Sequence, residues 1–342
     1  RGVTFLLVAA NVALALAWLE RARRRALVMR VGWVIAGALL AAIYGVVRER
    51  TLNVRTLGPV SVLQPNVEEK REPTSRDSAY QVAYALSAQA LAEDGARLVI
   101  WPEAAVPTTF RHRPDWKLQV AAQAHFNSTP LLVGAFDIIT EGGRITDYFN
   151  AAFLFDSLGE SDSYPPYRKR YLVPVTERVP FLNPKWFGNL RYFGGATPGT
   201  DGPVYAVGLG RFGVLICYES IFEDLSRQYR RDGVDFLVNI TNDAWFGRTS
   251  APYQHAAHLV MRAIENRVGI ARAANTGISE FVDPLGRERQ RTALYTRTRV
   301  VSDIETTDAV TLYVRLGDWV GFLTVLGVFG LVGYAWWRQP RV

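Results

Sequence analysis

Residues 212–220 read FGVLICYES, an apolar run of mostly aliphatic and aromatic side chains that stops at a cysteine. Short runs of this kind, ended by a change to polar residues, are typical of buried strands in a parallel sheet. Cys217 is the only cysteine in 342 residues, so it forms no disulfide within the chain. A lone cysteine in an apolar run is most often a small buried hydrophobe, and the rest of the sequence decides whether this one is reactive.

Strand-like runs alternate with segments of helical periodicity through the middle of the chain. The predicted strands are 60–64, 97–102, 130–136, 150–156, 212–217, 235–241, 269–275 and 278–283. The predicted helices are 76–95, 114–127, 220–233 and 253–268. This alternation favours an α/β layered domain with a largely buried sheet. The segment 157–205 is loop-rich and unusually long for a connection, which indicates a functional role.

Three charge-free apolar runs flank this middle part, at residues 2–19, 31–47 and 319–337. At 1.5 Å per residue, such runs extend over roughly 26–29 Å, close to the hydrocarbon thickness of a bilayer. Buried core helices of this length normally keep a polar face, so we predict transmembrane helices. The predicted organisation is two spans with a basic loop in 1–50, a catalytic domain in 51–310, and a last span with a short tail in 311–342. The start at an arginine favours a fragment of a longer membrane protein.

Arginines suggest the orientation of the predicted spans. RARRR at 21–25 lies between the first two spans, and RQPR at 338–341 follows the last. The positive-inside rule places both segments in the cytoplasm and the middle domain on the opposite face. The formal net charge is +7, from 39 Lys and Arg against 32 Asp and Glu. Much of this excess lies between the spans, so it indicates attraction to anionic lipids rather than to nucleic acid.

Three residues at predicted strand ends form a chemical unit. Glu103 follows the strand 97–102, Lys169 lies in YRKRYLVP, and Cys217 ends its own strand. Taken singly, the first two are ordinary solvated charges, but together they supply a base, a cation and a nucleophile. Moving a proton from a thiol near pKa 8.5 to a carboxylate near 4.3 costs about 5.7 kcal/mol. We expect burial to raise the pKa of Glu103, and Lys169 and a helix dipole to lower that of Cys217.

The motifs WPEAA, YRKRYLVPVTERVP and ICYES, in this order, resemble the carbon–nitrogen hydrolase (nitrilase) superfamily. With the apolar spans, VLQPNVEEKREP at 62–73 and the segment 242–287, the sequence resembles the membrane-bound apolipoprotein N-acyltransferase family within it. The resemblance extends over about 58–307 and the flanking spans. It implies a nitrilase-like αββα sandwich flanked by transmembrane helices.

The resemblance also implies roles for individual residues. Cys217 is expected to be the nucleophile, Glu103 the general base and acid, and Lys169 the stabiliser of the oxyanion together with the backbone N–H of Tyr218. Further residues that align with functional positions of the family are Glu177, Tyr218 and Glu219. In DAWFGRT, Trp245 and Phe246 are predicted to form an aromatic lid, with simple packing of a surface loop as the alternative.

The implied reaction moves a fatty acyl chain from a phospholipid, expected to be phosphatidylethanolamine, to a diacylated apolipoprotein through a Cys217 thioester. The resemblance implies a multi-pass protein of the bacterial inner membrane with its catalytic domain on the periplasmic face. It implies no metal, no cofactor and no nucleic-acid partner.

Three other readings stay open. A membrane-tethered amidase would use the same triad with water as the acceptor. A non-enzymatic membrane scaffold would keep the fold without the reaction. A papain-like site would pair Cys217 with His255 or His258, which we interpret instead as incidental histidines on an amphipathic helix. That pair has no further ligand at metal-binding spacing.

Overall fold

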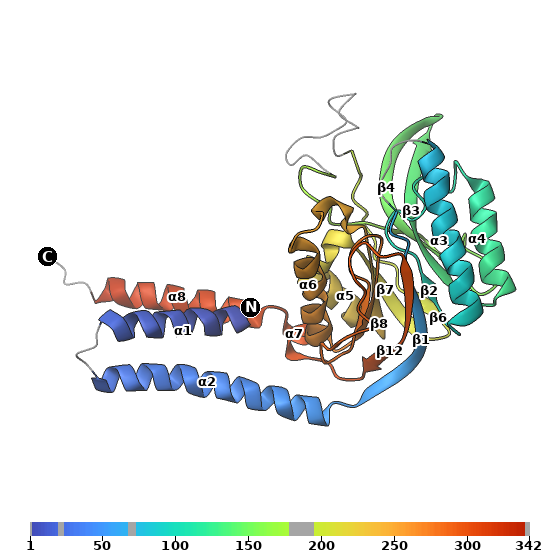
Figure 1. Cartoon of the computed structure of the whole chain (residues 1–342). Helices are drawn as coiled ribbons and strands as arrows, with labels where there is room; N and C mark the ends of the chain where they lie inside the picture. The colour runs from blue at the N-terminus through green and yellow to red at the C-terminus, as the bar shows by residue number, and fades with distance from the viewer. Residues whose placement is uncertain (1, 20–23, 68–72, 178–194, 339–342) are drawn as a thin grey trace. The chain divides into compact units, whose positions relative to one another are not determined.

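The structure is a computed structural model that describes residues 2–19, 24–67, 73–177 and 195–338. The chain divides into two compact units (Figure 1). One is Val54–Val314, and the other combines Arg1–Asn53 with Arg315–Val342. Part of the basic segment at 21–25 and of the motif at 62–73 lies outside the described residues.

The smaller unit is built from apolar helices. Its helices are α1 (Gly2–Leu19), α2 (Arg24–Thr51) and α8 (Trp319–Trp337). Among the described residues, Val28–Thr51 and α8 are long and apolar enough to cross a membrane, whereas Thr4–Leu16 is a shorter apolar helix. Their large apolar side chains are exposed, which is typical of segments that meet lipid or other helices. The first predicted span stays a prediction.

The larger unit contains two six-stranded sheets. The first sheet, in spatial order, is β12 (Thr298–Thr307), β1 (Val54–Gln64), β2 (Val99–Ile100), β3 (Leu131–Glu141), β4 (Arg144–Phe155) and β5 (Tyr167–Arg168). The second is β11 (Glu288–Arg289), β10 (Glu280–Val282), β9 (Gly269–Ala274), β8 (Phe236–Thr241), β7 (Gly210–Ile216) and β6 (Tyr205–Val207).

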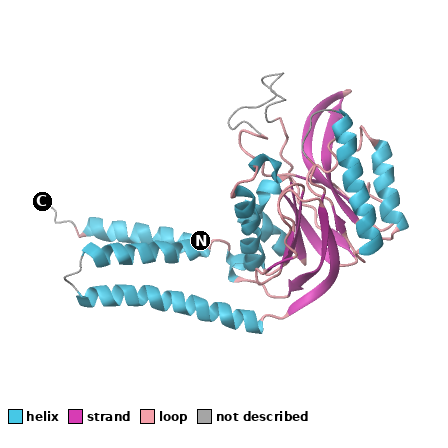
Figure 2. Cartoon of the chain, viewed as in Figure 1, coloured by secondary structure: helices cyan, strands magenta, loops and turns pink. Residues whose placement is uncertain are grey.

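Helices cover the outer face of each sheet (Figure 2). Helices α3 (Pro73–Glu93) and α4 (Pro114–Phe126) lie on the first sheet, while α5 (Glu223–Arg231) and α6 (Ala251–Asn266) lie on the second. Side-chain alternation explains the layers. Val60 and Val62 of β1 pack against strands of the second sheet, and Leu63 turns the other way, toward α3 and α4. The predicted αββα sandwich is confirmed.

The predicted strands are present, but the structure adds strands that the sequence did not reveal. The most extensive is β12, which pairs antiparallel with β1 from Val54↔Thr307 to Gln64↔Thr298. The predicted helix at 220–233 also begins later. Cys217–Ile221 is a 3-10 helix, η3, and α5 starts only at Glu223.

Parallel pairing decides where polar residues gather. Strands β1, β2 and β3 run parallel in the first sheet, and β7, β8 and β9 run parallel in the second. Their carboxyl ends therefore meet at one edge of each sheet. Loops that leave this edge carry Glu103 and Cys217.

Candidate active site

The loop after β2 places Glu103 close to the neighbouring strand. Pro102 passes so near Gly134 of β3 that a Cβ at Gly134 would lie 2.2 Å from the Pro102 carbonyl oxygen. Only glycine allows this approach without a shift of the loop. The Val106 N–H donates to the Gly134 carbonyl at 3.0 Å and fixes the loop from its far side.

The Glu103 carboxylate is held by one hydrogen bond on each oxygen. Asn150 Nδ2 donates to Oε1 at 2.6 Å, and the Asn242 backbone N–H donates to Oε2 at 2.7 Å. The side chain is buried, and burial raises the pKa of Glu103 above its ordinary value, as expected from the sequence, although Lys169 and both hydrogen bonds oppose the shift. A carboxylate with a raised pKa is a better proton acceptor from a thiol.

Lys169 directly follows β5 and is 1% exposed. Its Nζ lies 2.6 Å from Glu177 Oε1 and 3.6 Å from Glu103 Oε1. Burial alone would lower the pKa of Lys169, but Glu103, Cys217 and Glu177 together raise it, so the ammonium stays charged. We call Glu103, Lys169 and Glu177 the Glu103 cluster.

Asn150 connects the two main members of the Glu103 cluster. Its carbonyl accepts the Lys169 N–H at 2.8 Å, while its side chain donates to Glu103 at 2.6 Å. Glu177 is fixed as well, because its Oε2 accepts the Val173 N–H at 2.8 Å. The ammonium and both carboxylates are therefore positioned by backbone as well as side-chain groups.

Cys217 directly follows β7 and begins η3 with a φ of 53°, in the left-handed region that side chains other than glycine seldom adopt. Burial, reinforced by Glu103, raises the pKa of Cys217 to about 12, although Lys169 acts in the opposite direction. The expected net lowering is therefore wrong: Lys169 does favour the thiolate, but burial outweighs it. The five-residue η3 also offers only a short dipole.

Glu219 ties the nucleophile turn to the loop that carries Lys169. Its Oε2 accepts from Tyr167 Oη at 2.6 Å and from the Ile216 N–H at 2.7 Å. Its Oε1 accepts the N–H groups of Arg170 at 2.7 Å and Tyr171 at 3.1 Å. Through these hydrogen bonds, the completely buried carboxylate joins the two segments.

The other predicted site residues lie around this centre. Tyr218 is partly buried, with its ring edge-on to Phe222 at 5.1 Å between centroids. Trp245 and Phe246 lie on η4 (Asp243–Phe246), and Trp245 is 70% exposed. An exposed tryptophan fits a lid and a surface loop equally, so the lid stays a prediction.

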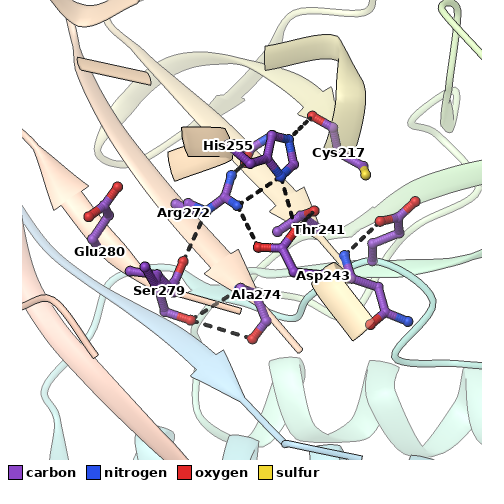
Figure 3. A network of polar contacts seen from close by, with 12 residues as sticks. Cys217, Thr241, Asp243, His255, Arg272, Ala274, Ser279 and Glu280 are labelled. Carbon is purple, nitrogen blue, oxygen red and sulfur yellow. Dashed lines mark hydrogen bonds and ion pairs between the residues drawn. The ribbon is translucent and has the colours of Figure 1, made fainter. Parts of the chain in front are cut away.

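Figure 3 shows a buried polar network on the second sheet that the sequence did not reveal. Asp243 binds His255 and Arg272, and His255 reaches the backbone carbonyl of Cys217. We call these three residues the His255 network. The interpretation of His255 as an incidental histidine is wrong, because it is buried with both ring nitrogens in contact with polar partners. A warning signal was an arginine inside GIARAA, because a charge in a buried strand needs a partner.

Metal ligation finds no support in the described ranges: they contain no group of three or more His, Cys, Asp or Glu side chains that could hold an ion. The chemistry available is that of a thiol beside a buried carboxylate and a fixed ammonium. This arrangement can form and break a covalent acyl bond at sulfur.

Comparison with known proteins gives one family and many relatives. The family model of the carbon–nitrogen hydrolases matches residues 60–304. Apolipoprotein N-acyltransferase of Geobacter metallireducens is 35% identical over 286 residues, covering 82% of this chain and 54% of the relative. The protein of that name from Chlorobaculum tepidum is 30% identical over 363 residues, covering 97% and 68% respectively. The chain thus spans about half to two thirds of the length of these curated relatives.

Among solved structures, an amidase from Nesterenkonia sp. matches with a TM-score of 0.56 and 19% identity, covering 78% of this chain and 96% of the amidase. A mutant of that amidase, solved with the acetamide moiety of fluoroacetamide added covalently at its active-site cysteine, matches with a TM-score of 0.57 and 19% identity, covering 77% and 95%. At this identity the likeness is one of fold.

Proposed function

Because this chain belongs to the carbon–nitrogen hydrolase family, in the branch of the apolipoprotein N-acyltransferases, we propose that it moves a fatty acyl chain from a phospholipid to the N-terminal amine of a diacylated apolipoprotein. The observation that carries the proposal is the Lys169 ammonium, buried between the carboxylates of Glu103 and Glu177 beside the only cysteine. The proposed donor is phosphatidylethanolamine, and the acceptor is a diacylglyceryl-cysteine.

The first half-reaction forms a thioester. Cys217 Sγ attacks the ester carbonyl carbon while Glu103 takes the thiol proton. Because burial raises the pKa of both groups, the proton transfer accompanies the attack and no free thiolate accumulates. Lys169 and the Tyr218 N–H stabilise the oxyanion. When the oxyanion collapses, the carbon–oxygen bond breaks and Glu103 returns its proton to the leaving lysophospholipid.

The second half-reaction repeats these steps with an amine. The α-amine of the apolipoprotein attacks the thioester carbon, Glu103 takes its proton, and Cys217 leaves and recovers a proton from Glu103. The product carries a new amide bond. Water is the competing acceptor, and an entrance lined by apolar side chains such as Trp245 would disfavour it.

We place the protein in the bacterial inner membrane with the catalytic unit on the periplasmic face. Two helices of membrane-spanning length among the described residues support membrane attachment. The arginine-rich segment at 21–25 and Arg338 support the orientation by the positive-inside rule. A membrane location suits two substrates that are both lipids.

Intact-protein mass spectrometry of the purified chain, incubated with phosphatidylethanolamine in detergent, tests the first half-reaction. We expect a mass increase of one acyl chain that neutral hydroxylamine removes and that Cys217→Ala lacks. Addition of a diacylated lipopeptide should then transfer the chain to the peptide. Release as free fatty acid, or turnover of small soluble amides instead, would favour a membrane-tethered amidase and overturn the proposal.

A further inference from the structure

The backbone of Cys217 is contacted by a residue that the proposed reaction does not use. His255 Nε2 lies 3.1 Å from the Cys217 carbonyl oxygen. A carbonyl oxygen only accepts hydrogen bonds, so Nε2 carries the hydrogen and donates it. In Figure 3 this oxygen is directed at the imidazole, and the Cys217 sulfur is directed away from it.

The imidazole itself is held on its other edge and on its face. Nδ1 lies 2.9 Å from Asp243 Oδ1 and 3.2 Å from Arg272 Nη2, so this edge is held whichever group supplies the hydrogen. The Phe246 ring meets the imidazole edge-on at 5.6 Å between centroids. His255 is therefore a fixed donor rather than a mobile side chain.

Asp243 is anchored in turn. Arg272 Nη2 donates to its Oδ2 at 2.9 Å, and the Thr241 hydroxyl donates to its Oδ1 at 3.0 Å. Although burial acts in the other direction, Arg272 and His255 lower the pKa of Asp243 to about 2. Gly277 passes so close that a Cβ there would lie 2.1 Å from Asp243 Oδ2, so the carboxylate is enclosed.

The contact matters because of what lies on the other end of the same peptide bond. The unit joining Cys217 to Tyr218 is planar and trans, so its C=O and N–H point in opposite directions. A carbonyl turned to His255 therefore turns the Tyr218 N–H away from His255, to the side on which the sulfur lies. Tyr218 is the second residue of η3, where a backbone N–H has no acceptor within its own helix.

Cys217 also occupies a conformation that needs support. Its φ of 53° lies in the left-handed region, which side chains other than glycine seldom adopt, so surrounding contacts must hold the turn. Rotation of the 217–218 peptide changes ψ of Cys217 and φ of Tyr218, and it would direct the carbonyl oxygen into the site and withdraw the N–H. A donor fixed on the carbonyl opposes that rotation.

We propose that His255 is a positioning residue: by binding the Cys217 carbonyl, it holds the Tyr218 N–H in the orientation that stabilises the acyl oxyanion. This inference rests on the proposed function only for the identity of the acyl donor. It applies to any carbonyl compound that Cys217 attacks, so it can be tested without lipid.

Two reactions of Cys217 separate this role from general support of the fold. Acylation by p-nitrophenyl butyrate passes through an oxyanion, whereas alkylation by iodoacetamide is a displacement at carbon that forms none. The full chain in detergent is compared with His255→Asn, whose amide reaches only the Nδ1 position, and His255→Gln, whose amide nitrogen reaches the Nε2 position. His258→Asn, three residues along α6, is the matched control.

We expect His255→Asn to slow acylation about 10²-fold, the cost of losing one oxyanion donor, with alkylation unchanged. His255→Gln should keep acylation within about fivefold of the wild type, because the donor to the carbonyl is restored. Both variants lose the same imidazole packing, so thermal unfolding should fall alike in both. His258→Asn should match the wild type in both reactions.

Equal losses of acylation and alkylation in His255→Asn, or equal acylation by the Asn and Gln variants, would overturn the inference. A wild-type chain that is alkylated but not acylated by the ester would overturn it too. Failure with phosphatidylethanolamine alone, after normal acylation by the ester, counts only against the proposed function.

Discussion

Two polar networks lie beside Cys217: one acts on its thiol, and the other binds its backbone carbonyl. The Glu103 cluster combines two carboxylates with one ammonium around Lys169 Nζ, and it acts on the sulfur side. The His255 network combines Asp243 with Arg272 and ends on the backbone carbonyl. The first has the groups needed to move a proton, and the second has those needed to fix a peptide plane. In a site of this kind, one set of residues transfers protons and a separate set fixes the orientation of the backbone.

The largest expected effect comes from the chemical side. Glu103→Gln keeps an oxygen that can accept from Asn150 or Asn242, but it removes the base. Thioester formation with the ester or the lipid should fall about 10³-fold or more, in line with general base catalysis at the upper end of its range. Stopped-flow acylation is the measurement, and urea unfolding should show only a small loss of stability because Glu177 still pairs with the Lys169 ammonium at 2.6 Å. An active Glu103→Gln variant would break the assignment of chemistry to this cluster.

Substitutions in the His255 network should mainly lower the stability of the fold. Arg272→Leu leaves the Asp243 carboxylate buried without its guanidinium partner, since Arg272 is 0% exposed. Removing one partner of a buried pair costs about 3–5 kcal/mol. Urea unfolding checks this value. Replacement of Arg289, a partly exposed arginine of the same unit, is the control and should cost less than 1 kcal/mol. A variant as stable as the wild type would show that the network contributes little to the fold.

Glu280 tests the balance of charge beside the His255 network. Glu280 of β10 stands opposite Arg272 of β9 in the strand register. Its Oε2 lies 3.4 Å from Arg291 Nε, and neither carboxylate oxygen accepts a hydrogen bond from a described residue. Burial raises the pKa of Glu280 to about 7 from 4.5. The protonated Glu280 side chain therefore contributes its full stability to the fold below pH 4.5, and this contribution to the free energy of unfolding is lost as the pH rises through 7.

Glu280→Gln removes this proton uptake. Between pH 5 and pH 8, the free energy of unfolding of the variant should rise by about 3 kcal/mol relative to that of the wild type. This value follows from a pKa difference of about 2.5 at about 1.36 kcal/mol per pKa unit. Urea unfolding at both pH values is the measurement, with Glu141→Gln, which replaces an exposed carboxylate at the end of β3, as the control. A gain that is the same at both pH values would contradict a raised pKa.

The smallest effect on the stability of the fold is expected from substitution of the exposed Trp245. Trp245 is 70% exposed, so Trp245→Ala should change the free energy of unfolding by less than about 0.5 kcal/mol. If the side chain acts as a lid, hydrolysis of the preformed thioester should speed up while its formation from the small ester does not. An unchanged rate of hydrolysis would assign Trp245 to loop packing alone.

The same division separates what the sequence revealed from what it did not. Glu103, Lys169 and Cys217 each stand at the end of an apolar run or in a family motif, so local patterns located them. Asp243, His255 and Arg272 lie in three different elements and meet only through the packing of α6 and η4 on the second sheet. The arginine in GIARAA indicates that a buried partner is needed, but no local pattern identifies Asp243 or His255 as that partner.

The fold shows a similar limit. Strands such as 235–241, buried on both faces, were predicted from continuous aliphatic runs, whereas β12 reads TRVVSDIETT and gives no such run. Its place comes from pairing with β1, more than two hundred residues earlier. The net pKa of Cys217 was also out of reach, because the degree of burial is a property of the packed sandwich.

The hydrogen bond from the Asn242 N–H to Glu103 crosses from the second sheet to the first. The base therefore stands on one layer and the thiol on the other, and neither layer alone holds a complete reactive site. A chain with only one sheet formed would carry a thiol without its base. Packing of the two layers is thus the step that turns Cys217 from an isolated thiol into one with a carboxylate base beside it.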